Sequence, residues 1–384
     1  MNARERFKAV VDFTPVDYAP IFGFPGAAGV SRSYWTSVRD RLTATGMPTH
    51  VGRSGQNEED CASWNRYWGT TGPLNCNIDL RRGVHGFAEQ RRIGAGFEII
   101  ESESGEITRQ VVDNDNTYSM PEFVTYPVRD RASWEFYRRR MTPAGRMSSE
   151  EFGAACRGYE ERDLPLVVNI TGAYHHLRNL MGPEGLSLAF YDDPELIREM
   201  SVWHLGQTRE FVFPLVERLQ PEAITLSEDL CYNHGMLLSP VLFHEFCGPM
   251  YREVCDLAAS CHVDLVAVDS DGNVMEYVPL AASCGIRGFY PFEVKAGNDL
   301  FSLRERHPDL VFFGWLEKEL INEGNANRIE EEITSKVPLL LKKGRYFPNA
   351  DHSLQPLATF KNLCRFMTIL HQVCSNPEGE FPRA

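Results

Sequence analysis

Two aspartates, separated by one residue, follow an apolar run near the middle of the chain. The run Leu265–Val268 predicts a short, fully buried strand, and it leads directly into Asp269 and Asp271. Residues two apart in a strand point to the same side of a sheet, so both carboxylates are expected to face one point in space. Burying such a pair is costly unless it meets a cation, a shared proton, a basic partner or solvent. The pair is therefore the first candidate for a functional site.

Charged side chains also follow other apolar runs of the chain. In a parallel α/β barrel all strands end at one face, and active sites collect there. We expect acid–base or metal chemistry from one group of these residues and substrate contacts from another. The first group is Glu228, Asp229, Asp269, Asp271 and His352, and the second is Phe24, His175, Glu293, Trp315 and Lys318. Five charged strand ends in series favour an active site over chance placement.

The acidic residues and Lys318 also have structural interpretations. Asp269 and Asp271 could cap the following helix, because carboxylates suit helix N-termini. Glu228 and Asp229 could pair with a basic residue across the barrel mouth, and Lys318 could serve as a counter-charge for the acids. The sequence leaves these alternatives open.

The ring-bearing candidates have alternatives as well. His352 could lie on a surface loop or hydrogen-bond to its neighbour Asp351, instead of acting as a metal ligand or proton donor. One of His175 and His176 could face the site while the other is packed or solvated. Trp315 and the other aromatic residues near the presumed mouth are consistent with an apolar or aromatic ligand, but core packing is the favoured interpretation for most of them.

Six short apolar runs in the second half of the chain must position these residues. The runs are 164–170, 223–226, 265–268, 286–290, 310–315 and 345–347. Most are continuously apolar, as in parallel strands buried on both faces, and segments of helical period separate them. So many β–α units in one chain predict a (β/α)₈ barrel, and no GxGxxG follows a strand to favour a dinucleotide-binding sheet.

The first half of the chain is less regular. Residues 18–24 are a plausible first strand, followed by a Gly-rich segment. Residues 97–103 and 107–112 predict an antiparallel hairpin, which we interpret as an insertion on the barrel. Because no Pro-, Gly- or Ser-rich linker divides the chain, we expect residues 1–384 to form a single domain.

Composition restricts the functional classes. The 384 residues carry a net charge of -14, which disfavours nucleic acid as a partner. No apolar run reaches membrane-spanning length, and the N-terminus lacks a signal-peptide pattern. Ten scattered cysteines without a CxxC pair predict free thiols. Together these features predict a cytoplasmic enzyme.

Several segments resemble the uroporphyrinogen decarboxylase superfamily, which includes cobalamin-dependent methyltransferases. The resemblance lies in the opening residues 2–10, in Thr14–Ile21, and in Leu238–Tyr251 after the strand that leads to Glu228. Residues 119–128 with Trp134 are similar to a poorly characterised branch that carries an Asp-Ser-Asp-Gly and a late Asp-His. The resemblance covers nearly the whole chain and implies a (β/α)₈ barrel.

The chain departs from both well-known activities of this superfamily. True uroporphyrinogen decarboxylases hold the substrate carboxylates with an Arg-Gln-Ala-Gly-Arg motif, whereas residues 22–29 contain no arginine. The corrinoid methyltransferases bind zinc through a His-x-Cys pair and a late Cys. Asp269-Ser270-Asp271 occupies the first position and His352 falls near the second. Oxygen ligands with one imidazole still suit zinc, although less selectively.

The resemblance implies a methyltransferase component as the leading hypothesis. A divalent metal, zinc in the first place, would be held by Asp269, Asp271 and His352, and would polarise the heteroatom of a small methoxy or methylamino compound. Glu228, Asp229 or Glu293 would complete the metal shell or handle protons. The methyl acceptor would be a corrinoid on a separate partner protein, and a homodimer is compatible with the resemblance.

Two other hypotheses stay open. In a metal-free decarboxylase or lyase acting on a small carboxylate, Asp269 or Asp271 would stabilise a protonated intermediate and His352 would deliver a proton. Alternatively, the barrel would bind a corrinoid or porphyrin-like ligand without turning it over. The sequence does not name the substrate.

Overall fold

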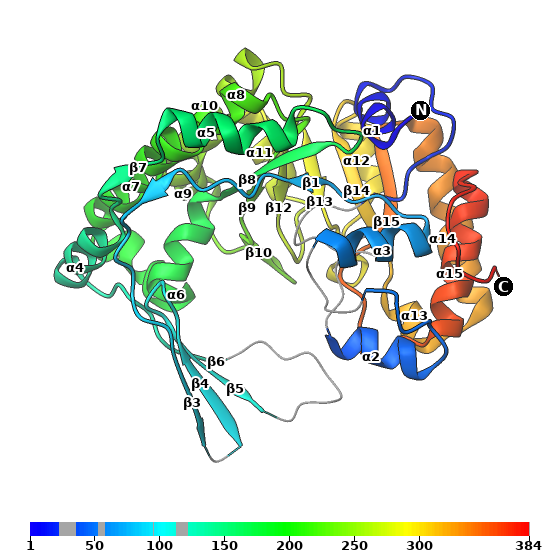
Figure 1. Cartoon of the computed structure of the whole chain (residues 1–384), viewed down its shortest axis with the longest axis horizontal. Coiled ribbons are helices and arrows are strands. Elements are labelled where there is room, and N and C mark those ends of the chain that lie inside the picture. Colours follow the sequence, from blue (N-terminus) through cyan, green and yellow to red (C-terminus); the bar gives the residue numbers. More distant parts are fainter. Residues whose placement is uncertain (23–35, 53–57, 95, 113–121, 384) are drawn as a thin grey trace.

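A seven-stranded parallel sheet forms the centre of the protein. The computed structural model describes residues 1–22, 36–52, 58–94, 96–112 and 122–383. The sheet has the order β1 (Leu74–Asn75), β8 (Leu166–Thr171), β9 (Ala223–Ser227), β12 (Leu265–Asp269), β13 (Gly288–Tyr290), β14 (Val311–Leu316) and β15 (Tyr346–Ala350). It curls like part of a barrel, with helices on its outer side (Figure 1). The fold is thus of the TIM-barrel type, and closure by an eighth strand remains a prediction.

The six predicted parallel strands are confirmed as β8, β9, β12, β13, β14 and β15. The predicted first strand, residues 18–24, is described only as far as Phe22, which forms an isolated parallel bridge with Thr71. Asn349 of β15 donates to the carbonyl of Phe22 at 3.4 Å. The chain at Phe22 therefore lies beside β15 as well as beside the segment that leads into β1.

The helices follow the strands in the alternation that the sequence predicts. Those before β9 are α1 (Ala3–Asp12), α2 (Thr36–Ala44), α3 (Glu58–Trp68), α4 (Arg131–Met141), α5 (Ser149–Cys156), α6 (Ala173–Asp192), α7 (Pro194–Phe211) and α8 (Phe213–Leu219). Those after it are α9 (Pro240–Leu242), α10 (Gly248–Ser260), α11 (Tyr277–Ser283), α12 (Leu300–Arg306), α13 (Glu319–Glu323), α14 (Ala326–Lys343) and α15 (Phe360–Cys374). Asp193 and Ser239 cap α7 and α9 by accepting from the backbone N–H groups of Leu196 and Leu242.

Apolar side chains fill the amino-terminal half of the barrel interior. This buried cluster contains Val167, Ala223, Leu265, Ala267, Val311, Phe313 and Phe347, together with Phe7 and Val10 of α1. Phe313 and Phe347 stack with ring centroids 4.4 Å apart. Since side chains alternate along a strand, the inward positions of Leu265 and Ala267 place Asp269 on the same inner side, toward the carboxyl ends.

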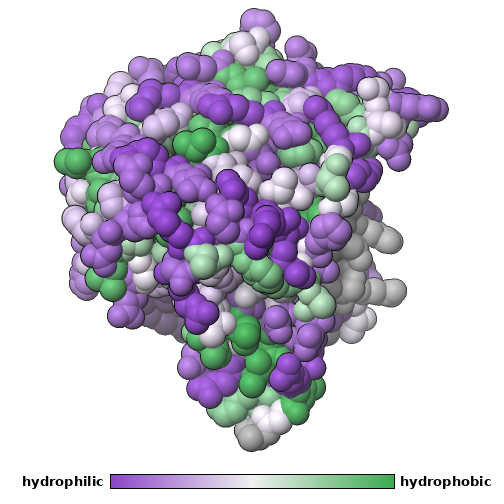
Figure 2. Space-filling view, turned by 90° about the vertical axis from the view of Figure 1, so that its left-hand side faces the viewer, coloured by the Kyte–Doolittle hydropathy of each residue, from purple (hydrophilic) through white to green (hydrophobic). Residues whose placement is uncertain are grey.

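A second, antiparallel sheet projects from the body of the protein (Figure 1). It consists of β3 (Gln90–Gly94), β4 (Phe97–Glu101), β5 (Ile107–Val111) and β6 (Glu122–Thr125). The segments for which a hairpin is predicted are β4 and β5, so the inserted unit is larger than the sequence suggests. Apolar side chains show on this projection in Figure 2, and Ile93 is 74% exposed.

The remaining strands are short pairs at the periphery. They are β2 (Arg81–Arg82) with β7 (Gly145–Arg146), and β10 (Cys231–Tyr232) with β11 (Gly235–Met236). All ten cysteines are free thiols, as the sequence predicts. Among the helices in the described ranges, none has the length and apolarity needed to cross a membrane.

Candidate active site at the carboxyl ends of the strands

Asp269 is the last residue of β12 and points into the open end of the sheet. Its side chain is half-buried, and no donor of the described residues hydrogen-bonds to its carboxylate. Burial and then the negative charges of Asp271 and Asp229 raise the pKa of Asp269 well above its ordinary value, against a smaller opposing effect of His352. Asp269 is therefore a carboxyl group that favours a proton, a cation or a ligand donor.

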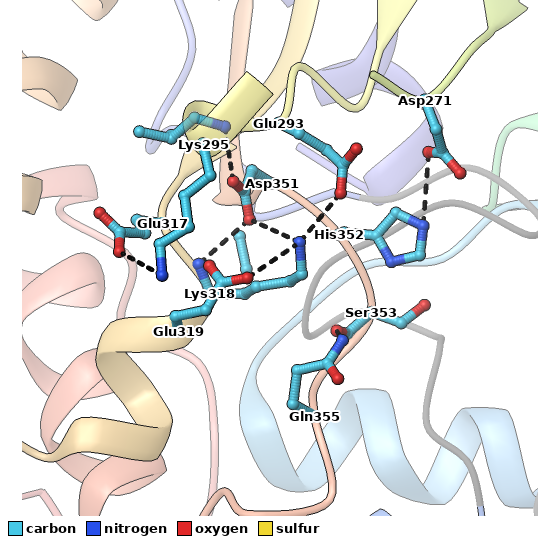
Figure 3. A network of polar contacts seen from close by, with 12 residues as sticks. Asp271, Glu293, Lys295, Glu317, Lys318, Glu319, Asp351, His352, Ser353 and Gln355 are labelled. Carbon is cyan, nitrogen blue, oxygen red and sulfur yellow. Dashed lines mark hydrogen bonds and ion pairs between the residues drawn. The ribbon is translucent and has the colours of Figure 1, made fainter. Parts of the chain in front are cut away.

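Asp271 and His352 form a pair (Figure 3), and the charges of both act on Asp269. The Nε2 atom of His352 lies 3.3 Å from Oδ1 of Asp271, although 81 residues separate them in sequence. Burial opposes the charged form of Asp271, but the hydrogen bond from His352 and its charge outweigh burial and lower the pKa of Asp271. Burial likewise opposes the His352 cation, and the bond to Asp271 outweighs it and raises the pKa of His352. The pair thus favours an imidazolium bound to a carboxylate.

Lys318 lies in a cluster of acids rather than at a free surface (Figure 3). Its side chain is 9% exposed, and its ammonium group lies 3.0 Å from Glu293, 3.5 Å from Glu319 and 3.8 Å from Asp351. Asp351 also accepts from the backbone N–H groups of Val294 and Lys318, at 2.8 and 3.0 Å. Burial raises the pKa of Asp351 to about 6, against the opposing charge of Lys318.

This cluster connects the ends of four strands. The second carboxylate oxygen of Glu293 accepts from the backbone N–H of Gly272, at 3.0 Å. Gly272 follows Asp271, and Asp351 precedes His352, so both members of the pair are attached to the cluster through their neighbours. Glu293 and Lys318, predicted as substrate contacts, are therefore placed where they hold the Asp271–His352 geometry.

Asp229 is paired with a residue that the sequence reading did not single out. Arg178 of α6 lies 2.5 Å from the Asp229 carboxylate and also donates to the Asp229 carbonyl at 3.2 Å. The backbone of Asp229 is left-handed, with φ 53°, where the chain turns away from β9. No local pattern marks Arg178, because its partner comes from the next strand of the sheet.

The Glu228 side chain is directed toward the start of α6. It is 0% exposed and accepts from the backbone N–H of His175, at the start of α6, at 3.0 Å. A Cβ atom at Gly172 would lie 2.3 Å from Cδ of Glu228, so only glycine leaves room for this carboxyl group. Burial raises the pKa of Glu228 to about 7, against the hydrogen bonds that favour the anion. Glu228 is thus placed in the support of α6, away from the Asp271–His352 pair.

The remaining predicted substrate contacts are His175, Trp315 and Phe24, and they do not form one group in the structure. The His175 ring lies near Arg178 and Asp229, and burial followed by the Arg178 charge lowers its pKa, which favours a neutral imidazole. Trp315 packs in the core and donates from Nε1 to the Asn298 carbonyl at 2.8 Å, away from the barrel interior. Phe24 lies outside the described residues.

The sequence predicts a divalent metal held by Asp269, Asp271 and His352, and the positions of these side chains bear on that prediction. Two carboxylates and one imidazole are donor types that suit a divalent cation, and the unneutralised Asp269 is where positive charge would be most favourable. However, within the described residues no three His, Cys, Asp or Glu side chains converge as a group that could hold a metal ion. His352 is turned onto Asp271 instead. The donor types fit, but their arrangement is not a preformed metal site.

Comparison with known proteins shows a similarity of fold to a solved structure. No protein-family model matches the chain, and no curated protein does. Among solved structures, the chain is similar to a methyltransferase from Methanosarcina mazei, with 15% identity, 97% of this chain and 98% of that chain covered, and a TM-score of 0.55. It shares the fold of a methyltransferase. The similarity agrees with the predicted TIM-type fold, and the superfamily itself stays a prediction.

Two further solved structures match only in part. One is an uncharacterized protein, with 11% identity, 57% of each chain covered and a TM-score of 0.25. The other is a uronate isomerase from Bacillus halodurans, with 10% identity, 63% and 62% covered and a TM-score of 0.21. Neither supports an inference about this chain.

Proposed function

We propose that this chain is a methyltransferase component that removes a methyl group from a small methoxy or methylamino compound at the open end of its sheet. The observation that carries the proposal is Asp269, an inward, half-buried carboxyl group with a raised pKa and no hydrogen-bond donor among the described residues. The fold shared with a methyltransferase supports methyl transfer as the class of reaction. The proposed acceptor is a corrinoid carried by a partner protein.

Loss of a methyl group from oxygen or nitrogen leaves a basic heteroatom, so a proton or a positive charge must reach that atom. A raised pKa keeps Asp269 protonated to higher pH than an ordinary aspartate, so it can donate to the leaving atom. The imidazolium of His352, held by Asp271, supplies positive charge beside it. Arg178 neutralises Asp229 and so limits the negative charge at the same end of the sheet.

A divalent metal, zinc in the first place, is an alternative part of the proposal. In that case Asp269 would be ionised and would hold the metal together with Asp271 and His352 in place of donating a proton, and the metal when bound would supply Lewis-acid stabilisation to the leaving heteroatom. Elemental analysis of purified protein and of Asp269→Asn tests this part without an activity assay. We expect about one equivalent of metal in the native protein and a clear loss in the variant. Metal-free native protein that still transfers methyl groups would exclude this part only.

A metal-free decarboxylase or lyase is the second candidate, and the Asp271–His352 pair favours it. An imidazolium with a raised pKa, paired with the partly exposed carboxylate of Asp271, is a suitable proton donor for a carbanion formed after loss of carbon dioxide. Such an enzyme would release carbon dioxide from a small carboxylate and would keep its activity after treatment with a chelator. Methyl transfer that a chelator abolishes would exclude it.

The deciding experiment follows the cobalt spectrum. Reduced corrinoid is mixed with the protein and a panel of methoxy and methylamino compounds, and formation of methylcobalt is recorded in the visible range. We expect Asp269→Asn to lower the rate at least about 100-fold, the usual effect of losing an acid–base group. Asp264→Asn, at the opposite end of the same strand and paired with Lys8, is the matched control and should keep the native rate.

Two results would contradict the proposal. An unchanged cobalt spectrum with every donor would favour a protein that binds a corrinoid without turnover. A native rate in Asp269→Asn would show that the carboxyl group without a partner takes no part in the reaction.

A further inference from the structure

A cavity lies at the free edge of β8, and its lining does not include Asp269, Asp271 or His352. Its volume is about 360 Å³, within the range of small-molecule sites. Residues 76–81, β8, α4, α6, α7 and α8 surround it. Its lining includes Tyr137, His176, Trp203, His204, Gln207 and Arg81, and none of the carboxylates of the strand ends.

One wall of the cavity is an unpaired length of β8. Strand β1 pairs with β8 only at Leu166 and Val167, and the backbone N–H of Cys76 makes the last contact, to the Val167 carbonyl at 2.9 Å. Beyond Cys76 the chain leaves the sheet. Because alternate residues of a strand hydrogen-bond to the same side, the backbone groups of Asn169 and Thr171 face the space that β1 leaves.

One backbone group on this free edge of β8 is hydrogen-bonded by a histidine side chain. Nε2 of His204 donates to the Thr171 carbonyl at 2.8 Å. In the part of the chain that the structure describes, the N–H and carbonyl of Asn169 and the N–H of Thr171 have no strand beside them. The cavity wall therefore offers a ligand two hydrogen-bond donors, the N–H groups of Asn169 and Thr171. It also offers one acceptor, the Asn169 carbonyl.

Side-chain polar groups of the cavity are also unused. Nε2 of His176 is buried without a hydrogen-bond partner among the described residues, and none of them bonds to the Gln207 amide. The only charged lining residues of the described chain, Asp79 and Arg81, neutralise each other through two contacts of 2.9 and 3.0 Å. Burial lowers the pKa of His204 to about 4 and keeps that imidazole neutral. The lining of the cavity is therefore polar but carries no net charge.

The aromatic lining offers flat surfaces. His176 and His204 stack with ring centroids 4.0 Å apart and planes 5° from parallel, and Trp203 lies against His176 at 5.9 Å. Trp134 packs edge-on against Trp203 and fixes its orientation. Rigid aromatic walls bind planar molecules with little loss of conformational freedom.

We propose that this cavity binds an uncharged, planar ring compound that carries a lactam or amide edge. The lactam N–H would donate to the Asn169 carbonyl, and its carbonyl oxygen would accept from a neighbouring backbone N–H of β8. The ring would lie against the aromatic lining, with the Gln207 amide at its polar rim. This site does not depend on the proposed methyl transfer, because it shares no residue with the strand-end acids.

Binding of 2-quinolinone, a bicyclic lactam, tests the proposal against N-methyl-2-quinolinone, which has the same rings but no N–H donor. The dissociation constant is measured by calorimetry and by quenching of tryptophan fluorescence. We expect the N-methyl compound to bind about five- to tenfold more weakly, the effect of one lost neutral hydrogen bond. Equal binding of the two, or no binding of either at millimolar concentration, would overturn the proposal.

Variants locate the binding site. Gln207 is half-buried on α7, so Gln207→Trp should fill the cavity without disturbing the core and should abolish binding. Gln207→Leu should weaken it about five- to tenfold. Asp269→Asn, at a residue outside the cavity lining, should leave the dissociation constant unchanged. Loss of binding in Asp269→Asn, together with native binding in Gln207→Trp, would place the ligand in the barrel and refute the assignment.

Discussion

Replacing Lys318 by methionine would remove the only positive charge in contact with three described acids while keeping much of the side-chain volume. The ammonium group lies 3.0 Å from Glu293, 3.5 Å from Glu319 and 3.8 Å from Asp351, and the Asp351 side chain is 1% exposed. Removing one partner of a buried ion pair costs about 3–5 kcal/mol. We expect the lower end, about 3 kcal/mol at pH 8, because two backbone N–H groups still stabilise the Asp351 carboxylate.

The cost should depend on pH, and the sign follows from Asp351. Its pKa is about 6 in the protein and 3.8 ordinarily, so the folded state binds this proton more tightly and stability falls as the pH rises through that window. At pH 5 Asp351 is already largely protonated and gains little from Lys318. There the substitution should cost only about 1 kcal/mol, from the more exposed pairs with Glu293 and Glu319.

Thermal unfolding at both pH values measures this difference. An unfolding entropy near 2.1 cal/mol/K per residue gives about 0.8 kcal/mol/K for 384 residues. We therefore expect Tm to fall by about 4 °C at pH 8 and about 1 °C at pH 5. Lys295→Met is the matched control, because Lys295 pairs with Glu317 at 3.4 Å but is 58% exposed, and it should lower Tm by at most about 1 °C at either pH.

The difference in Tm loss between Lys318→Met and Lys295→Met tests whether the buried cluster stabilises the fold. If Lys318→Met lowers Tm no more than Lys295→Met at pH 8, the cluster in Figure 3 does not hold the strand ends together. A loss of equal size at pH 5 and pH 8 would refute the part assigned to Asp351.

Two further predictions concern the surroundings of the site. Gly172→Ala should lower the free energy of unfolding by about 2 kcal/mol, because the added Cβ clashes with Glu228. Gly206→Ala should raise it by up to about 1 kcal/mol, because an added Cβ there meets nothing within 4 Å. Chemical denaturation measures both free energies, and a change of the opposite sign in either variant would contradict the reasoning. His352→Gln should raise the pKa of Asp271, read by carbon-13 NMR. The stability that the pair contributes should be present while His352 is charged and Asp271 is ionised. It should be lost as the pH rises through the raised pKa of His352 and lost again at acid pH as Asp271 is protonated, and an identical pH profile in the variant would exclude this.

The parallel sheet could be predicted because its strands carry a local signal. Continuous apolar runs such as Leu265–Val268 are buried on both faces, and their order along the chain is also their order in the sheet. By contrast, β1 has only two residues, and all five residues of β3 are exposed, so neither shows a hydrophobic pattern. The inserted sheet was therefore recognised only in part.

Strand periodicity explains which site residues could be anticipated. Asp269 continues the inward alternation of Leu265 and Ala267, which is readable from spacing. The same alternation predicts that Trp315, two residues after the inward-facing Phe313, also faces the barrel interior. The left-handed backbone at Gly314 and Trp315, with φ of 95° and 69°, turns the indole into the outer core instead. Such a reversal depends on the surrounding structure and leaves no trace in residue spacing.

The ion pairs at the strand ends indicate more sharply than residue spacing which carboxyl group takes part in the reaction. In the described chain, Asp271 has His352, Asp229 has Arg178, and Asp351 shares Lys318 with Glu293, whereas Asp269 has no basic side chain in contact. Each of the first three already has a counter-charge among the described residues. Burial raises the pKa of Asp269, and no described basic side chain in contact with it offsets that cost. Whatever the substrate is, the proton, cation or donor group that satisfies Asp269 has to come from outside these pairs, and this requirement makes Asp269 the residue through which the reaction is best tested.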